Sequence, residues 1–285
     1  MARRQIDGAD AEAGIQAART LLLVPEAPLI GLMLVVYLAI GQPPLLGVGV
    51  ALLIISFIAR CLALIGARAS HTAARYREAD TLSQIALALH PWSADALALR
   101  GSIVLGQGRP AEAEPLLSRA LGLLPGRADI HTARSVALLA LGRPAEAAEA
   151  ARQALALEPG YAPALLHLAE AELATGAPAL AVEDRLRDGL ASAPAPEDEA
   201  ALRCALGALL FTEQRQAEAL LTLRGAEALL GRCRPARQLE LRVRLGELMI
   251  AQGQIERARE QFRSVAALDP SGRYTGAAWR ASHLL

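Results

Sequence analysis

The stretch Gly108-Arg-Pro-Ala-Glu-Ala113 occurs a second time, 34 residues further along the chain, as Gly142-Arg-Pro-Ala-Glu-Ala147. Looser copies begin at Gly176 and Gly253. Glycine readily adopts the left-handed backbone that ends many helices, and proline is favoured in the first turn of a helix. Each copy therefore predicts the junction between one helix and the next.

Prolines recur with the same period and mark the ends of larger units. The first three steps are 34, 34 and 35 residues, and the full set is Pro91, Pro125, Pro159, Pro194, Pro235 and Pro270. Such a period is typical of solenoids, in which each unit is an antiparallel helix pair, A and B, stacked on its neighbour. A degenerate first pair has residues 60–74 as its helix A, and the units that follow are predicted to begin near Ala94, Ala128, Ala162, Ala200 and Leu239.

Small residues recur at three positions of the unit, where they allow helices A and B to approach closely. The position in the middle of helix A is occupied by Ala67, Gly101, Ser135, Ala169, Gly207 and Gly246. The position at the start of helix B is occupied by Ala79, Ala113, Ala147, Ala181, Ala219 and Ala258. The position late in helix B is occupied by Ala86, Ala120, Ala154 and Ala226. Large side chains at these positions would clash with the facing helix.

The period, the Gly-x-Pro junctions and the small residues together resemble the tetratricopeptide repeat (TPR) family. The resemblance covers residues 60–285, about four fifths of the chain. It implies an all-α fold, with a right-handed solenoid of about five to six helix pairs over residues 60–272 and a capping helix over residues 273–285. It also implies a protein–protein interaction scaffold, because helix A of each TPR unit lines a concave groove.

Projecting the TPR register onto this chain predicts which side chains line the groove. The predicted protein-binding residues are Asp95, Leu99, Ser102, Leu105, Asp129, Thr132, Val136, Leu139, Leu166, Glu170, Leu173, Cys204, Phe211, Arg244 and Glu247. Such a groove is small and mostly apolar, and it suits a helix or an extended segment of a partner protein. For each residue the alternative is packing within or between the units.

The composition disfavours two classes of partner. The chain contains neither lysine nor asparagine, so all 29 basic residues are arginines. The TPR domains that hold chaperone C-terminal tails resemble each other in a clamp of those two residues, so a chaperone carboxylate tail is disfavoured. The net charge is zero, whereas nucleic-acid-binding domains usually carry a large basic excess.

Two uncharged segments precede the repeats, at residues 27–40 and 44–59, with only Gly41-Gln-Pro43 between them. They predict a helical hairpin in the lipid bilayer over residues 26–66, because glycine and proline break the helix at the link. A cleaved signal peptide would have a single apolar region and is disfavoured. Each segment is short for a hydrocarbon core of about 30 Å, which leaves two options: a hairpin extended at its outer ends to span the bilayer, and a re-entrant or monotopic one. Gly47 and Ala51 are predicted to contact another membrane helix.

Arginines flank the hairpin on both sides, and the link is uncharged. They are Arg3, Arg4 and Arg19 before it and Arg60, Arg68, Arg75 and Arg77 after it. The positive-inside rule therefore places residues 1–25 and the TPR units in the cytoplasm. We expect the plasma (inner) membrane of a bacterium, with an interfacial helix as one option for residues 1–25.

The sequence contains no pattern typical of a catalytic, metal-binding or cofactor-binding site. The three cysteines and five histidines are dispersed, and a Walker-type phosphate loop needs a lysine that the chain lacks. We therefore expect no enzyme and no cofactor. Two functions stay open: a membrane-anchored adaptor or assembly scaffold, and a permanent accessory subunit of a large bacterial membrane complex of the energy-converting or secretion type.

Overall fold

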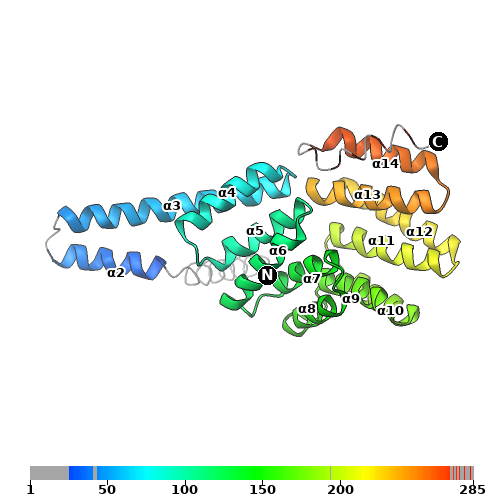
Figure 1. Ribbon diagram of the computed structural model, residues 1–285, viewed down its shortest axis with the longest axis horizontal. Helices are drawn as coiled ribbons and strands as arrows, with labels where there is room; N and C mark the ends of the chain where they lie inside the picture. Colours follow the sequence, from blue (N-terminus) through cyan, green and yellow to red (C-terminus); the bar gives the residue numbers. More distant parts are fainter. Residues whose placement is uncertain are drawn as a thin grey trace, which may run out of the picture. The chain divides into compact units, whose positions relative to one another are not determined.

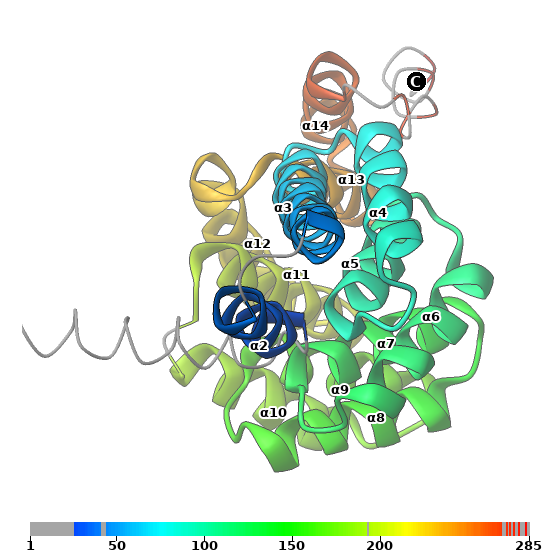
Figure 2. The same ribbon diagram turned by 90° about the vertical axis from the view of Figure 1, so that its left-hand side faces the viewer.

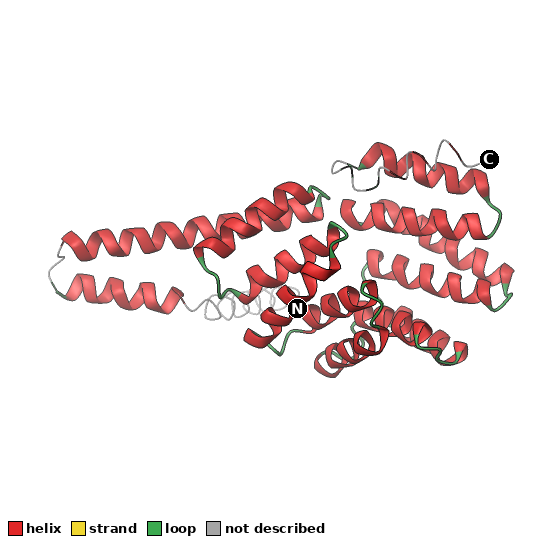
Figure 3. Ribbon diagram, in the orientation of Figure 1, coloured by secondary structure: helices red, strands yellow, loops and turns green. Residues whose placement is uncertain are grey.

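The computed structural model describes residues 26–40, 44–192 and 194–269, together with residues 272, 274, 276, 279 and 283. These residues form thirteen α-helices, one 3-10 turn and no strand (Figure 3). They belong to two compact parts of the chain, an N-terminal part that ends at Leu62 and a C-terminal part that begins at Ala63. The N-terminal segment 1–25, the link of the predicted hairpin and most of the predicted capping helix 273–285 lie outside the described residues.

The N-terminal part contains two apolar helices. Helix α2 covers Glu26–Ala39, and helix α3 covers Pro44–Thr72 and continues into the C-terminal part. The two helices approach closely at Gly47, where an added Cβ atom would lie 3.0 Å from the ring of Tyr37 in α2. Ala51, one turn further along, is exposed. Gly47 thus lies at the contact between α3 and α2.

The C-terminal part is a series of antiparallel helices that follow one another along a curved path (Figures 1 and 2). After the end of α3 these are α4 (Tyr76–Leu89), α5 (Ala94–Gly106), α6 (Pro110–Leu123), α7 (Ala128–Ala140), α8 (Pro144–Leu157), α9 (Ala162–Ala174), α10 (Ala179–Ala191), α11 (Pro196–Thr212), α12 (Gln216–Leu229), the 3-10 turn Leu230–Arg232, α13 (Pro235–Ala251) and α14 (Ile255–Leu268). Each full unit pairs one odd-numbered helix A with the following helix B, as the period predicts.

The junctions between helices have the predicted backbone chemistry. Gly108, Gly142, Gly176 and Gly253 all have φ between +70° and +83°. Two junctions lack a glycine, and there Ala74 and Gln214 adopt the same left-handed conformation, with φ of +60° and +64°. A side chain with a Cβ atom is strained in this conformation, so these two junctions are intrinsically less favourable.

Complementary side-chain size packs helix A against helix B. In three units a glycine of helix A faces a large buried side chain of helix B: the pairs are Gly101 with Leu117, Gly207 with Leu223, and Gly246 with Phe262. A Cβ atom on any of these glycines would come within 2.6–2.8 Å of the facing side chain. The second full repeat, α7 with α8, uses the opposite combination, with Ser135 in helix A and Ala151 in helix B, both fully buried. The predicted small position is therefore one half of a matched pair.

The third unit departs from the predicted register. Ala181, expected to fill the small position at the start of helix B, is exposed, and Val182 is fully buried in its place. Helix α10 begins at Ala179 with Pro178 as its N-cap, whereas α6 and α8 begin with their prolines. Relative to the 34-residue period, α10 therefore begins one residue later than α6 and α8, and its buried face is shifted by one position.

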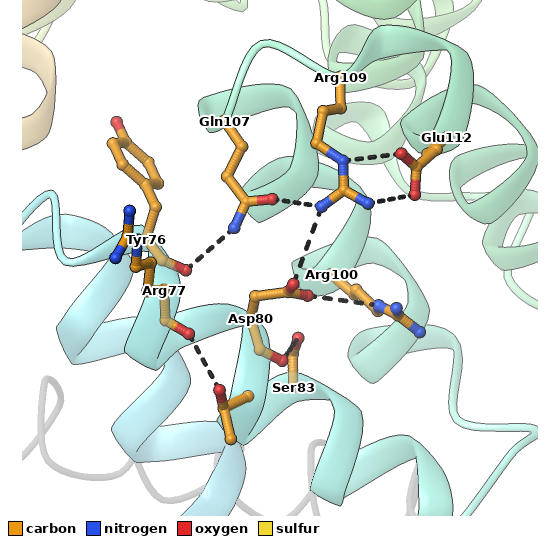
Figure 4. A network of polar contacts seen from close by, with 9 residues as sticks. Tyr76, Arg77, Asp80, Ser83, Arg100, Gln107, Arg109 and Glu112 are labelled. Atoms are coloured by element: carbon orange, nitrogen blue, oxygen red, sulfur yellow. Dashed lines mark hydrogen bonds and ion pairs between the residues drawn. The ribbon is translucent and has the colours of Figure 1, made fainter. Parts of the chain in front are cut away.

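Polar contacts join the degenerate first pair to the first full unit (Figure 4). The side-chain amide of Gln107 donates to the carbonyl oxygen of Tyr76 at 3.2 Å, and Arg109 donates to Gln107 at 2.7 Å. Asp80 of α4 lies between Arg100 and Arg109, with ion-pair distances of 3.6 and 3.9 Å. The first pair is thus packed as a member of the solenoid.

One buried hydrophobic cluster contains residues from both ends of the solenoid. Ala74 and Tyr76, at the turn of the first pair, belong to the same cluster as Leu239, Met249 and Phe262 of the last pair. The first and last pairs therefore share a core. The helix A side of the solenoid, for which the sequence predicts a concave groove, is therefore also bordered by the first and last pairs.

Candidate binding cavity

The solenoid has two adjoining inner cavities, and the larger of them has a volume of about 570 Å³. Its apolar lining comes from Leu105 of α5, Val136 and Ala140 of α7, and Ala236 of α13. Its polar lining comprises His71, Thr72, Tyr76, Ser102, His167, Arg234, Arg237 and Glu240. Helix A side chains of several units thus meet the first and last pairs around one space.

A smaller cavity of about 220 Å³ shares four lining residues with the larger one, namely His71, Thr72, Ser102 and Arg234. Its remaining walls carry more charge, from Arg68, Asp95, Arg127 and Asp129. The two cavities form a continuous inner surface over the first pair and the first two full units, with a mainly apolar part and a mainly charged part.

Six of the residues predicted to line the groove lie on these two cavities. They are Ser102, Leu105 and Val136 in the larger cavity, and Asp95, Leu99 and Asp129, again with Ser102, in the smaller one. All six belong to helices α5 and α7, the A helices of the first two full units. In this half of the solenoid, the TPR register therefore indicates residues that line the two cavities.

Three predicted residues belong to the core and not to the inner surface. Leu166 is 1% exposed, Cys204 is completely buried, and Thr132 is 5% exposed with its hydroxyl donating to the carbonyl of Ala128. Burial raises the pKa of the Cys204 thiol to about 12. Leu166 of α9 and Cys204 of α11 belong to one hydrophobic cluster with residues of the neighbouring helices, whereas Thr132 is a buried residue of α7.

The other predicted residues are scattered. Leu139 packs against the cluster of the second unit, and Leu173 and Glu247 are exposed. Phe211 lines a separate cavity of about 220 Å³ with Gln216, Leu220, Ala251, Gln252 and Gln254. These residues do not lie on the two inner cavities.

Glu170 and Arg244, both predicted to bind a partner, bind each other. The distance between the Glu170 carboxylate and the Arg244 guanidinium is 2.6 Å, and His167 Nδ1 lies 2.9 Å from the same carboxylate. Burial raises the pKa of Glu170, but the His167 hydrogen bond and the Arg244 charge outweigh it and lower the pKa to about 2. The carboxylate is thus held ionised next to His167, which lines the larger cavity.

Arg127 organises the charged cavity. Its guanidinium bridges Asp95 at 3.0 Å and Asp129 at 2.7 Å. Burial raises the pKa of Asp129, but the hydrogen bonds from Arg127 outweigh it and hold that pKa below its usual value. The cavity therefore offers fixed carboxylates and hydrogen-bond donors.

The last pair brings a second set of charges. Arg237 pairs with Glu240 at 2.8 Å, and Arg234 makes an ion pair with Glu197 of α11. Burial lowers the pKa of Arg237, but the charge of Glu240 outweighs it and raises the pKa above its usual value. Arg127, Arg234 and Arg237 of the cavity linings are thus each paired with carboxylates.

Sequence reasoning missed the walls supplied by the two ends of the solenoid. His71, Thr72 and Tyr76 precede the first full unit, and Arg234 and Arg237 precede the predicted start of the last one. A 34-residue period describes how each unit contacts the next, and it contains no signal that the first and last pairs meet. Within the described residues, no group of three or more potential metal ligands is present.

Comparison with known proteins agrees with this architecture. Residues 128–161 match the tetratricopeptide repeat family. A thermophilic TPR protein of Thermus thermophilus aligns with a TM-score of 0.56 and 24% identity, over 67% of this chain and 99% of that one. PilF of Pseudomonas aeruginosa aligns with a TM-score of 0.50 and 19% identity, over 78% of this chain and 97% of that one. The chain matches no curated protein. Its described helices therefore have the fold of a tetratricopeptide repeat solenoid, with the family's sequence pattern in residues 128–161.

Proposed function

We propose that this chain is a membrane-anchored, non-catalytic scaffold whose solenoid binds a segment of a partner protein. The observation that carries the proposal is the cavity of about 570 Å³ on the helix A side. It combines apolar surface at Leu105 and Val136 with polar groups at Ser102, His167 and Arg237. Such a mixture suits a peptide, because a peptide presents apolar side chains together with backbone donors and acceptors.

Helix α3 supports the membrane anchor. Among the described residues, Gly47–Thr72 is the one helix that is long and apolar enough to cross a bilayer. Only 17% of its apolar window is buried, whereas a core helix of similar composition in a soluble protein is mostly buried. Its exposed side chains include Val48, Leu52 and Ile55. Lipid would remove this surface from water, which is favourable by about 25 cal/mol per Å².

The cytoplasmic side of a bacterial plasma membrane is part of the same proposal, since arginines follow the apolar segment. Cysteine scanning tests it. A cysteine in place of Leu221, which is 72% exposed, serves as the reporter in a chain whose Cys61 and Cys233 are replaced by serine. Intact cells treated with a membrane-impermeant maleimide should leave this cysteine unlabelled, and lysed cells should label it. Labelling in intact cells would contradict the orientation.

Photo-crosslinking tests the binding surface. A benzoylphenylalanine in place of Val136 faces the larger cavity, and one in place of Leu180, which is 70% exposed on α10, serves as the matched outer-surface control. Irradiation of cells should give a discrete crosslinked species with the Val136 variant and a weaker or different pattern with the Leu180 variant. Identical patterns from the two positions would contradict binding in the cavity.

Solubilisation in mild detergent separates a reversible scaffold from a permanent subunit. If the chain is a scaffold, gel filtration should yield free protein besides any complex, in a ratio that changes with dilution. A single stoichiometric complex that survives dilution would instead indicate a permanent accessory subunit of a larger membrane assembly. Recovery of the chain in the soluble fraction, without detergent, would contradict membrane anchoring.

A further inference from the structure

The first helix pair exposes large apolar side chains at its edge. Trp92, in the turn after α4, is 71% exposed, and Leu89 and Ile85 at the end of α4 are 39% and 45% exposed. Ile65 of α3 is 66% exposed. Removing such side chains from water is favourable in proportion to the apolar area that becomes buried. Their exposure therefore indicates a surface that something else covers.

Trp92 stands where the following units have glycine. The dipeptide Pro91-Trp92 aligns with Pro125-Gly126 and with Pro159-Gly160 one and two periods later. Gly160 has φ of +83°, whereas Gly126 and Trp92 are not among the described residues with positive φ, so the turn after α4 accepts a residue with a side chain. A tryptophan at this position is unnecessary for the turn, and it occurs in the pair whose helix A continues the apolar segment.

The packing of α4 on α3 fixes which end of the pair carries Trp92. Ala63 and Ala86 belong to one buried cluster, and a Cβ atom on Gly66 would lie 3.0 Å from Leu82. Residues of α4 thus approach earlier residues of α3 as the chain advances. Leu89 and Trp92 follow Ala86 and therefore lie at the end of the pair where Ala63 lies. In the sequence, the uncharged segment from Pro44 to Ala59 comes shortly before Ala63.

We propose that Trp92, with Leu89, contacts the headgroup layer of the membrane and sets the depth at which the solenoid rests on the bilayer. Tryptophan is enriched at this level of membrane proteins, because its ring is apolar and its indole N–H is a hydrogen-bond donor. The occupant is lipid because the surface continues an apolar segment of bilayer composition in the same helix. This inference rests on the membrane anchoring proposed above.

The chain contains two tryptophans, Trp92 and Trp279, which makes the test direct. Trp279→Phe leaves Trp92 as the single fluorophore, and Trp92→Phe leaves Trp279 as the matched control. Each full-length variant is reconstituted into phosphatidylcholine and phosphatidylglycerol vesicles, with and without acyl chains brominated close to the headgroup. Trp92 should lose roughly half of its fluorescence in the brominated vesicles. Trp279 should keep nearly all of its own.

Flotation and alkaline carbonate extraction of the same vesicles separate the two proposals. A chain that floats with the vesicles and resists extraction, but whose Trp92 is no more quenched than Trp279, would overturn the lipid contact and leave the anchor intact. A chain that does not float would overturn the anchor and the lipid contact together. Equal strong quenching of both tryptophans would also overturn a contact specific to the first pair.

Discussion

The carboxylate of Glu170 and the guanidinium of Arg244 form an ion pair of 2.6 Å between α9 and α13, the A helices of the third and fifth full units. These units are not neighbours in the chain, and α11 of the fourth unit contacts both helices. Buried Cys204 of α11 lies close enough to Arg244 to affect its pKa. The pair therefore links three successive units across the inner side of the solenoid, and a period based on adjacent units does not predict it.

Glu170→Gln should lower the free energy of unfolding by about 1–3 kcal/mol near neutral pH, because it leaves the Arg244 guanidinium without its carboxylate. The pKa of Glu170 is lowered from 4.5 to about 2 in the folded chain. A carboxyl group with a lowered folded-state pKa stabilises the fold above its unfolded pKa, and this contribution disappears as the pH falls from about 4.5 to about 2. Urea denaturation of the full chain in detergent at pH 7 and pH 3 measures both differences. The gap between the two proteins should narrow at pH 3.

Glu256 provides the matched control for Glu170. It pairs with Arg259 at 2.7 Å, but its side chain is 77% exposed. Exposed ion pairs contribute little to stability, so Glu256→Gln should leave the free energy of unfolding unchanged at both pH values. A Glu170→Gln effect as small as that of Glu256→Gln, or one that is equally large at pH 3, would contradict a stabilising role of the carboxylate.

The register shift of the third unit predicts opposite tolerance at two aligned alanines. Ala147 is fully buried at the start of α8, whereas Ala181, its counterpart 34 residues later, is exposed. Ala147→Leu should destabilise the chain by about 1–3 kcal/mol, because the extra atoms have no space. Ala181→Leu should have little effect. Thermal unfolding followed by circular dichroism compares the two, and an equal loss of stability would show that α10 keeps the register of the other units.

The backbone at Gln214 predicts a stabilising substitution. Gln214 has φ of +64° at the junction of α11 and α12, where other junctions have glycine. Gln214→Gly should raise the free energy of unfolding by up to about 1 kcal/mol, because the left-handed conformation disfavours a Cβ atom. Gly142→Ala, at a junction with φ of +70° and no nearby atom, should lower it by a similar amount. Denaturant midpoints that move in the same direction for both variants would refute this reasoning.

The repeat architecture was predictable from the sequence because each unit repeats the same local physics. The predicted starts at Ala94, Ala128 and Ala162 coincide with the first residues of α5, α7 and α9. The helices of the last two units begin four residues before the predicted Ala200 and Leu239, at Pro196 and Pro235, because these prolines open the helices. Gly-x-Pro junctions and small residues are short-range signals, so they survive in a single sequence.

The inner surface was predictable only where it depends on one unit at a time. Ser102 and Val136 line the larger cavity because an A helix turns the same face inwards in each of the first two units. Cys204 and the Glu170–Arg244 pair depend on how tightly three units curve around one another, and the Tyr76 wall depends on contact between the first and last pairs. Neither property is encoded in the period, so the register assigned Glu170, Cys204 and Arg244 to a groove and did not include Tyr76.

Size complementarity between helices A and B predicts that the first unit accepts the combination found in the second. Gly101 faces Leu117, and the corresponding residues one period later are Ser135 and Ala151. The Ser135 hydroxyl donates to the carbonyl of Ala147 at 2.8 Å. In the first unit the equivalent carbonyl, that of Ala113, lies 3.5 Å from a Cβ atom built on Gly101. A serine at position 101 would therefore find the same acceptor once Leu117 no longer blocks it.

The single substitutions should both be destabilising. Gly101→Ser places a side chain 2.7 Å from Leu117, which should lower the free energy of unfolding by about 1–3 kcal/mol. Leu117→Ala removes a fully buried side chain, which should lower it by about 2–5 kcal/mol. The double variant relieves the clash, partly fills the space and forms the hydroxyl bond. Its loss should therefore be smaller than the sum of the single losses, by about 0.5–3 kcal/mol.

Gly122→Ala is the control for the glycine itself, because a Cβ atom on this helical residue meets nothing within 4 Å. It should raise the free energy of unfolding by about 0.5–1 kcal/mol through helix propensity alone. A double-mutant cycle from urea denaturation of the four proteins measures the coupling between positions 101 and 117. Additive losses, together with a stabilising Gly122→Ala, would mean that packing between the two positions does not explain the glycine of helix A.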